Sequence, residues 1–218
     1  METPTAVTER IKTFNDLQTQ FGLQQSNDGN FFTEWFENLP ELSEEEKSRL
    51  DRLRQRYLHH RGDGLLLEGT VNFVVVSPLL ELAGFLDPPF KLRSPQSVTI
   101  EIEDPQETLK GLIDVLIVRE HLWILVLESK RNLIPVTAAL PQILAYLMAT
   151  APENNPENNP LFGLATNGDT FVFVKVDRQG TGQYDISESF TLLPRRNKFE
   201  DLLRVLKRLG QENISSLT

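Results

Sequence analysis

The order of apolar and polar segments predicts an α/β protein, in which a mixed β-sheet is flanked by helices and preceded by an N-terminal helical arm. Two apolar runs within residues 111–131 predict neighbouring buried strands, and the polar residues 119–121 predict the turn between them. After residue 61 the expected order is helix, three strands, helix, two strands, helix. Residues 1–61 have helical character instead. We therefore predict an arm over residues 1–61 and a core over residues 62–218.

Helical spacing and a capping motif define the arm. Apolar residues recur at helical intervals in its first part: Ile11, Phe14, Leu17 and Phe21. Ser43 and Glu46 form a capping box, and the helix that they begin is expected to run to about residue 59 and to end at Gly62 and Gly64. An aromatic patch lies before it: Phe31, Phe32, Trp35 and Phe36. The patch covers either the core or a second subunit, and core packing is the preferred interpretation.

The core begins with a helix expected over residues 68–84, which Pro78 either kinks or divides in two. The valines at 74–76 leave a strand open as the alternative. The later elements are a strand over 98–103, the hairpin within 111–131, a helix over 136–150, strands over 161–165 and 170–176, and a helix from 197 or 198 to 209. Asn167 and Gly168 predict a tight turn between the two later strands, and Gly210 is expected to end the last helix.

Length and composition favour one sizeable core and exclude several chemistries. The chain has 218 residues, of which 39% are hydrophobic and 24% charged, as in ordinary globular proteins. Neither a membrane span nor an apolar secretory stretch is found, so we expect a cytoplasmic protein that does not enter membranes. The chain has no cysteine and three histidines, which excludes thiolate sites and disfavours histidine clusters. An oxygen-ligated cation such as Mg²⁺ remains.

The net charge of −9 argues against nonspecific coating of nucleic acid, because such binding depends on lysine and arginine. Basic residues nevertheless gather in two clusters: Lys47, Arg49, Arg52, Arg54, Arg56 and Arg61, and Arg195, Arg196, Lys198, Arg204, Lys207 and Arg208. These clusters are either local positive surfaces or solvated helix faces, and the second interpretation is favoured.

Three charged residues mark the ends of the apolar runs: Asp114, Glu128 and Lys130. If Asp114 lies across the ladder from Glu128, the turn falls near His121, and the period of two puts Glu128 and Lys130 on one face. A divalent cation would offset the repulsion between the two carboxylates. The alternative is that these residues are charged because the strands end at solvent.

In this pattern the chain resembles the PD-(D/E)XK nuclease superfamily, and more closely the N-terminal nuclease region of type I restriction enzyme R subunits and stand-alone cyanobacterial restriction-endonuclease-like proteins. Five segments carry the resemblance in the family's order: residues 66–85, GLID at 111–114, VLESK at 126–130, PQILAY at 141–146 and FGLATNG at 162–168. The resemblance implies a restriction-endonuclease-like fold for the core.

The resemblance also implies the roles of site residues. Asp114, Glu128 and the carbonyl of Ser129 would bind the catalytic metal, and Lys130 would position the attacking water. The acidic residue of the first core helix would be Glu68, and Gln142 with Tyr146 would match a Gln-x-x-x-Tyr element that supports the site or touches DNA.

Simpler interpretations stay open for the supporting residues. Glu68 also suits the start of a helix, and Glu81 is a rival acidic candidate. Gln142 can cap or solvate its helix, and Tyr146 taken singly is more typical of a core. The chain departs from the family at Ile113, where the family has proline before the metal-binding aspartate.

The resemblance implies a Mg²⁺- or Mn²⁺-dependent endonuclease, a hydrolase that cuts DNA phosphodiester bonds. The alternative is a catalytically weak or inactive nuclease-fold module that binds DNA or a protein. Expected partners are DNA and either a second copy in a homodimer or a protein that delivers the substrate, because the chain is acidic. No glycine-rich phosphate loop is found, so we expect no ATP-driven motor.

Overall fold

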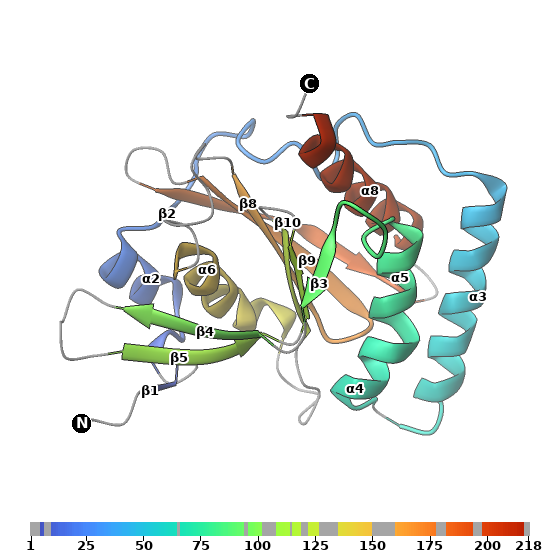
Figure 1. Ribbon diagram of the computed structural model, residues 1–218, viewed down its shortest axis with the longest axis horizontal. Helices are drawn as coiled ribbons and strands as arrows, with labels where there is room; N and C mark the ends of the chain where they lie inside the picture. The colour runs from blue at the N-terminus through green and yellow to red at the C-terminus, as the bar shows by residue number, and fades with distance from the viewer. Residues whose placement is uncertain are drawn as a thin grey trace.

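The structure is a computed structural model that describes residues 5–6, 10–64, 66–93, 96–101, 108–113, 115–118, 122–126, 135–149, 160–177, 182–193 and 198–215. It is a mixed α/β protein, which confirms the predicted class: a central sheet has α2 and α6 on one side and α3, α5 and α8 on the other (Figure 1). Among the described residues, no helix is both long enough and apolar enough to span a membrane.

The central sheet has seven strands in the order β2-β10-β9-β8-β7-β6-β3. Their bounds are β2 Gln24–Gln25, β3 Lys91–Arg93, β6 Val115–Val118, β7 Leu122–Val126, β8 Leu161–Thr166, β9 Thr170–Asp177 and β10 Gln183–Thr191. The pairs β7–β8 and β2–β10 are parallel, and the other neighbours are antiparallel. A separate sheet has the order β1-β5-β4, with β1 Thr5–Ala6, β4 Gln96–Glu101 and β5 Thr108–Ile113.

The helices follow the predicted order closely. Their bounds are α2 Phe14–Phe21, α3 Glu44–Arg61, α4 Glu68–Val71, the π-helical turn η1 Asn72–Val76, α5 Ser77–Leu82, the 3-10 turn η2 Val136–Ala139, α6 Leu140–Ala149 and α8 Phe199–Ser215. The predicted capping box of α3 is confirmed, because Ser43 Oγ accepts from the Glu46 N–H and Glu46 Oε2 accepts from the Ser43 N–H.

Alternation along β8 and β9 divides the interior into two cores. Leu161 and Ala165 of β8 belong to the core under α2 and α6, whereas Phe162 and Leu164 belong to the core under α3, α5 and α8. Both strands are therefore buried on both faces, as expected for central strands. At Gly163, helix α6 lies directly on the sheet, since a Cβ at this position would be 2.4 Å from Ile143 Cγ2.

The N-terminal segment contributes to both cores. Phe32 is fully buried, and the Trp35 ring packs edge-on against Phe190 of β10, so core packing of the aromatic patch is confirmed for these residues. Phe36 is 47% exposed. The Lys175 ammonium on β9 donates to the Phe31 carbonyl at 2.7 Å and pairs with Glu34, which ties this segment to the sheet. The division into an arm and a core stays a prediction.

Three details of the predicted elements need correction. The segment from Glu68 to Leu82 is helical throughout, so the strand alternative at 74–76 is wrong, and the interruption before Pro78 is the π-helical turn η1. The last helix continues past Gly210 to Ser215, so the prediction that this glycine ends the helix is wrong. Strand β10 was not predicted, since its sequence is rich in serine and acidic residues.

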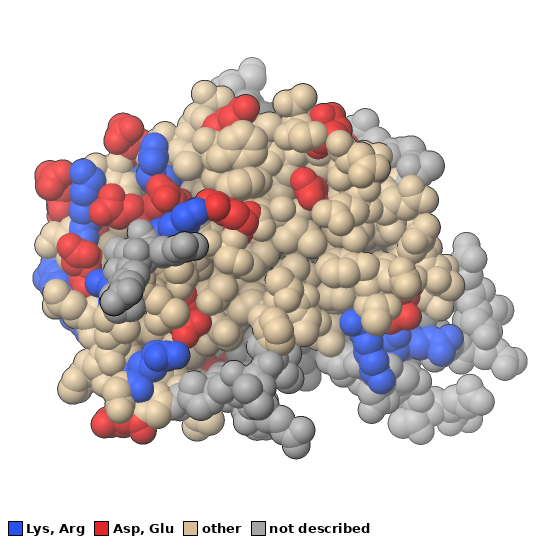
Figure 2. All heavy atoms as spheres, turned by 180° about the vertical axis from the view of Figure 1, so that it is seen from behind, with Lys and Arg blue, Asp and Glu red and all other residues tan. Residues whose placement is uncertain are grey.

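Most described basic residues of the two clusters are bound within the molecule. On α3, Lys47 pairs with Glu44, Arg49 with Glu81, and Arg61 with Asp169. On and near α8, the ion pairs are Lys198–Glu188, Arg204–Asp201 and Lys207–Glu46. Figure 2 accordingly shows blue and red side chains interleaved at the left of the rear face, with few charges over its centre. The favoured interpretation, solvated helix faces, therefore fits better than positive surfaces.

Candidate functional site

The strands that precede the predicted site end side by side. β7 and β8 are parallel and connected through η2 and α6, and their last paired residues are Val126 and Thr166. In open α/β sheets, ligands bind at the carboxyl ends of such strands. The ESK sequence of residues 128–130 begins two positions after Val126. Glu128, Ser129 and Lys130 themselves lie outside the described residues, as does Asp114.

The strands described on either side of position 114 belong to different sheets. β5 ends at Ile113 in the three-stranded sheet, and β6 begins at Val115 in the seven-stranded sheet. The chain therefore passes from one sheet to the other between Ile113 and Val115.

The register of the β6–β7 hairpin differs from the one that direct pairing of Asp114 with Glu128 requires. That pairing needs Val115 to lie opposite residue 127, but Val115 pairs with Ile124 and Leu116 with Trp123. The difference is three residues, because the ladder is centred between positions 119 and 120 rather than at residue 121. The direct-pairing hypothesis is therefore wrong for the described ladder.

Glu68 begins α4, beside the turn that follows β8. Its side chain is half-buried, and the residue before it, Leu67, makes no side-chain cap. Val71, one turn later, packs on that turn, since a Cβ at Gly168 would lie 2.9 Å from Val71 Cγ2. The rival candidate Glu81 lies near the other end of the helical segment, where it is exposed and pairs with Arg49 at 2.9 Å. Of the two acids, Glu68 lies at the end nearer the turn.

Gln142 and Tyr146 lie one turn apart on α6, as predicted. Gln142 is in the first turn of the helix and half-buried. Tyr146 is 3% exposed and belongs to the core formed with α2, which agrees with the simpler interpretation of this residue. The helix packs on β8. Gln142 lies at the N-terminal end of this helix, which is the end that follows β7 in the chain.

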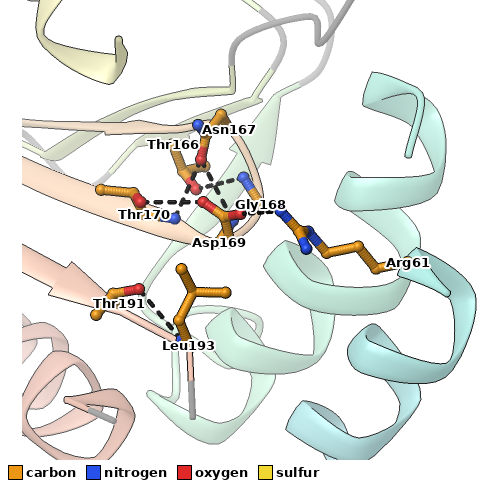
Figure 3. Close-up of polar contacts among 8 residues, drawn as sticks. All are labelled: Arg61, Thr166, Asn167, Gly168, Asp169, Thr170, Thr191 and Leu193. Atoms are coloured by element: carbon orange, nitrogen blue, oxygen red, sulfur yellow. Dashed lines mark hydrogen bonds and ion pairs between the residues drawn. The ribbon is translucent and has the colours of Figure 1, made fainter. Parts of the chain in front are cut away.

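The turn between β8 and β9 is the most completely hydrogen-bonded part of this region (Figure 3). Thr166 Oγ1 accepts from the Gly168 N–H at 2.9 Å, and Asn167 Oδ1 accepts from the N–H groups of Asp169 and Thr170. Gly168 has a φ of +100°, which only glycine adopts readily. The predicted Asn-Gly turn is confirmed.

Two residues of α3 hold this turn, and sequence reasoning did not assign them to it. Arg61 pairs with Asp169 at 3.2 Å, as Figure 3 shows, and the Tyr57 hydroxyl interacts with both. Burial, with the nearby Asp169 charge as the second cause, raises the pKa of Tyr57 to about 12. No local pattern identifies this cluster, because its members come from segments more than 100 residues apart. It fixes the position of the turn relative to α3.

Asn72, at the first position of η1, is a further residue that the sequence did not reveal. Its side-chain oxygen Oδ1 is buried and has no hydrogen-bond partner. The Asn72 N–H donates to the carbonyl of Glu68, so an α-helical turn separates the two residues and places them on one face. Buried acceptors without partners are uncommon in native proteins.

Comparisons with protein-family models and with curated proteins gave no match to this sequence. Within the described part of the chain, no three histidine or acidic residues gather as a metal-binding group, but the predicted metal ligands Asp114, Glu128 and Ser129 fall outside that part.

Proposed function

We propose that this chain is a divalent-cation-dependent endodeoxyribonuclease of the PD-(D/E)XK superfamily, with a restriction-endonuclease-like fold similar to the nuclease region of type I restriction R subunits. One observation supports this proposal above all. The antiparallel β6–β7 hairpin is followed by α6 and then by β8, which pairs with β7 in parallel. The ESK sequence begins two positions after the end of β7. The end of β7, which leads to the ESK sequence, and the end of β8, within the FGLATNG segment, therefore lie at one edge of the sheet.

The donor atoms fit a hard cation. The carboxylates of Asp114 and Glu128 and the Ser129 carbonyl are oxygen ligands, which suit Mg²⁺ or Mn²⁺, and the chain has no cysteine to favour a softer metal. The unpartnered Asn72 Oδ1 adds a further oxygen acceptor on the helix of Glu68. When bound, the cation would supply Lewis-acid stabilisation of charge on the scissile phosphate.

The chain's own residues supply the remaining chemistry in this proposal. The Lys130 ammonium orients the attacking water and neutralises charge that develops on the phosphate. Glu68 contributes a carboxylate to the site from the start of α4, and Gln142 contributes an amide from the first turn of α6. Tyr146, which is buried among apolar side chains, supports the position of α6 rather than contacting the substrate.

The alternative, a nuclease-fold module that binds DNA or a protein without cutting, is favoured by the charge distribution. Six of the clustered cations on α3 and on or near α8 form intramolecular ion pairs, and the net charge is −9. These six cations are already paired within the described part of the chain, so they contribute less to neutralising phosphates, and tight unaided DNA binding is disfavoured. A partner protein or a second copy would then deliver the DNA.

Cleavage of supercoiled plasmid in Mg²⁺ or Mn²⁺ tests the proposal. We expect nicked and linear products from the wild type, and a loss of about 100-fold or more in rate for Asp114→Ala and for Lys130→Ala. Glu81→Ala is the matched control, because it removes an exposed carboxylate that pairs with Arg49 and should cut normally. Equal cutting by all four proteins would indicate a contaminant, and DNA retention without cutting would favour the binding module.

A further inference from the structure

The helical segment from Glu68 to Leu82 presents its side chains in rows spaced by four residues. One row is exposed: Gly69, Phe73, Ser77 and Glu81. A second is buried: Val71, Val75 and Leu79. The third contains Glu68, Asn72, Val76 and Leu80, and its last two members are 2% exposed. The π-helical turn explains why the repeat is four rather than 3.6 residues.

The third row changes from polar to apolar along its length. Val76 and Leu80 bury their side chains in the core under α3, α5 and α8, as the row's direction requires. Asn72 lies one turn before Val76 in the same row, yet its side chain is a polar amide whose Oδ1 is fully enclosed. A valine at this position would continue the core without an unmet hydrogen bond. The amide is therefore unfavourable for folding alone.

We propose that Asn72 is a positioning residue of the metal site, whose Oδ1 accepts a hydrogen bond from a water molecule that hydrates the divalent cation. This inference rests on the proposed function. An acceptor needs a donor, and a phosphate oxygen cannot supply one, whereas hydrating water can. Mg²⁺ keeps several of its waters in protein sites, and Glu68 stands one turn away on the same row.

The orphaned oxygen gives the test two readouts with opposite signs. Asn72→Leu removes a buried acceptor without a partner, so without metal its Tm should rise by about 2–6 °C. The same variant should bind Mn²⁺ about 10- to 100-fold more weakly by calorimetric titration, as when other outer-shell partners are lost. Asn72→Asp keeps the acceptor and adds charge, so it should bind Mn²⁺ at least as tightly as the wild type while its metal-free Tm falls.

Phe73→Ala serves as the matched control on the neighbouring row. Its side chain is 81% exposed, so its removal should change neither the metal-free Tm nor the affinity for Mn²⁺. If Asn72→Leu binds Mn²⁺ as tightly as the wild type, the amide has a structural role and the inference is overturned. If the wild type neither binds Mn²⁺ nor cuts plasmid, it is the proposed function that fails.

Discussion

The β8–β9 turn touches the helical segment from Glu68 to Leu82 through Val71, and the row of that segment that contains Glu68 and Asn72 satisfies its polar groups differently from the turn. In the turn, the side chains of Thr166, Asn167 and Asp169 all have partners within the chain. On the row, the Asn72 oxygen has none. Both regions lie beside the carboxyl ends of β7 and β8.

The difference separates a structural cluster from a candidate functional one. A buried polar group that is fully hydrogen-bonded contributes to stability, whereas one without a partner costs stability and needs another explanation. The residues of the turn should therefore affect folding most, and the row should affect ligand binding with little loss of folding stability. Substitutions in the two regions test this division through the free energy of unfolding and the affinity for Mn²⁺.

The largest loss should follow Gly168→Ala. The substitution places a Cβ at a φ of +100° and 2.9 Å from Val71 Cγ2, so strain and overlap add. We expect a loss of about 2–3 kcal/mol by urea denaturation. Gly69→Ala is the matched control: a Cβ meets nothing within 4 Å on the exposed side of α4, and a gain of about 0.5–1 kcal/mol is expected. Equal effects of the two substitutions would contradict a tightly held turn.

The next effect depends on pH and concerns Tyr57. Its pKa in the folded protein is about 12, above the ordinary value of 10.0, so the unfolded chain loses the phenolic proton first. The stability from this group is complete below about pH 10 and is lost as the pH rises towards 12, by up to about 2 kcal/mol. Tyr57→Phe should remove this part of the pH dependence in urea denaturation at alkaline pH. If the stability of the wild type and of Tyr57→Phe fell in parallel as the pH rose, the raised pKa of Tyr57 would be refuted as a cause of the pH dependence.

Local signals predicted much of the fold. The Ser43–Glu46 capping box, the Asn167-Gly168 turn and the apolar runs of β8 and β9 each depend on neighbouring residues, and each was found where expected. β10 was missed because partners from β9 and β2 stabilise it despite a polar sequence. Gly210 was misinterpreted because a glycine is tolerated within a helix as well as at its end, and α8 continues to Ser215.

The candidate site shows the same limit more sharply. The sequence predicted a hairpin followed by a helix in this region, which the structure has, but not the register of β6 and β7, which differs by three residues. Register depends on where the turn closes, and a polar stretch of three residues allows several closures. Asn72 was not suspected because nothing in EGTVNFVVV distinguishes an orphaned amide from a solvated one.

The smallest effect on folding, and the one that decides between the two interpretations of Glu68, should follow Glu68→Gln. If the carboxylate only favours the start of α4, its loss costs about 0.5 kcal/mol and leaves Mn²⁺ binding unchanged, because the helical charge effect is weak. If it belongs to the metal shell, the free energy of unfolding changes as little, but the affinity for Mn²⁺ falls about 10- to 100-fold. Denaturation and calorimetric titration of the same protein sample separate the two. Glu81→Gln is its control, since that carboxylate is exposed and pairs with Arg49, and an equal loss of affinity in this control would mean that net charge, not position, determines metal binding.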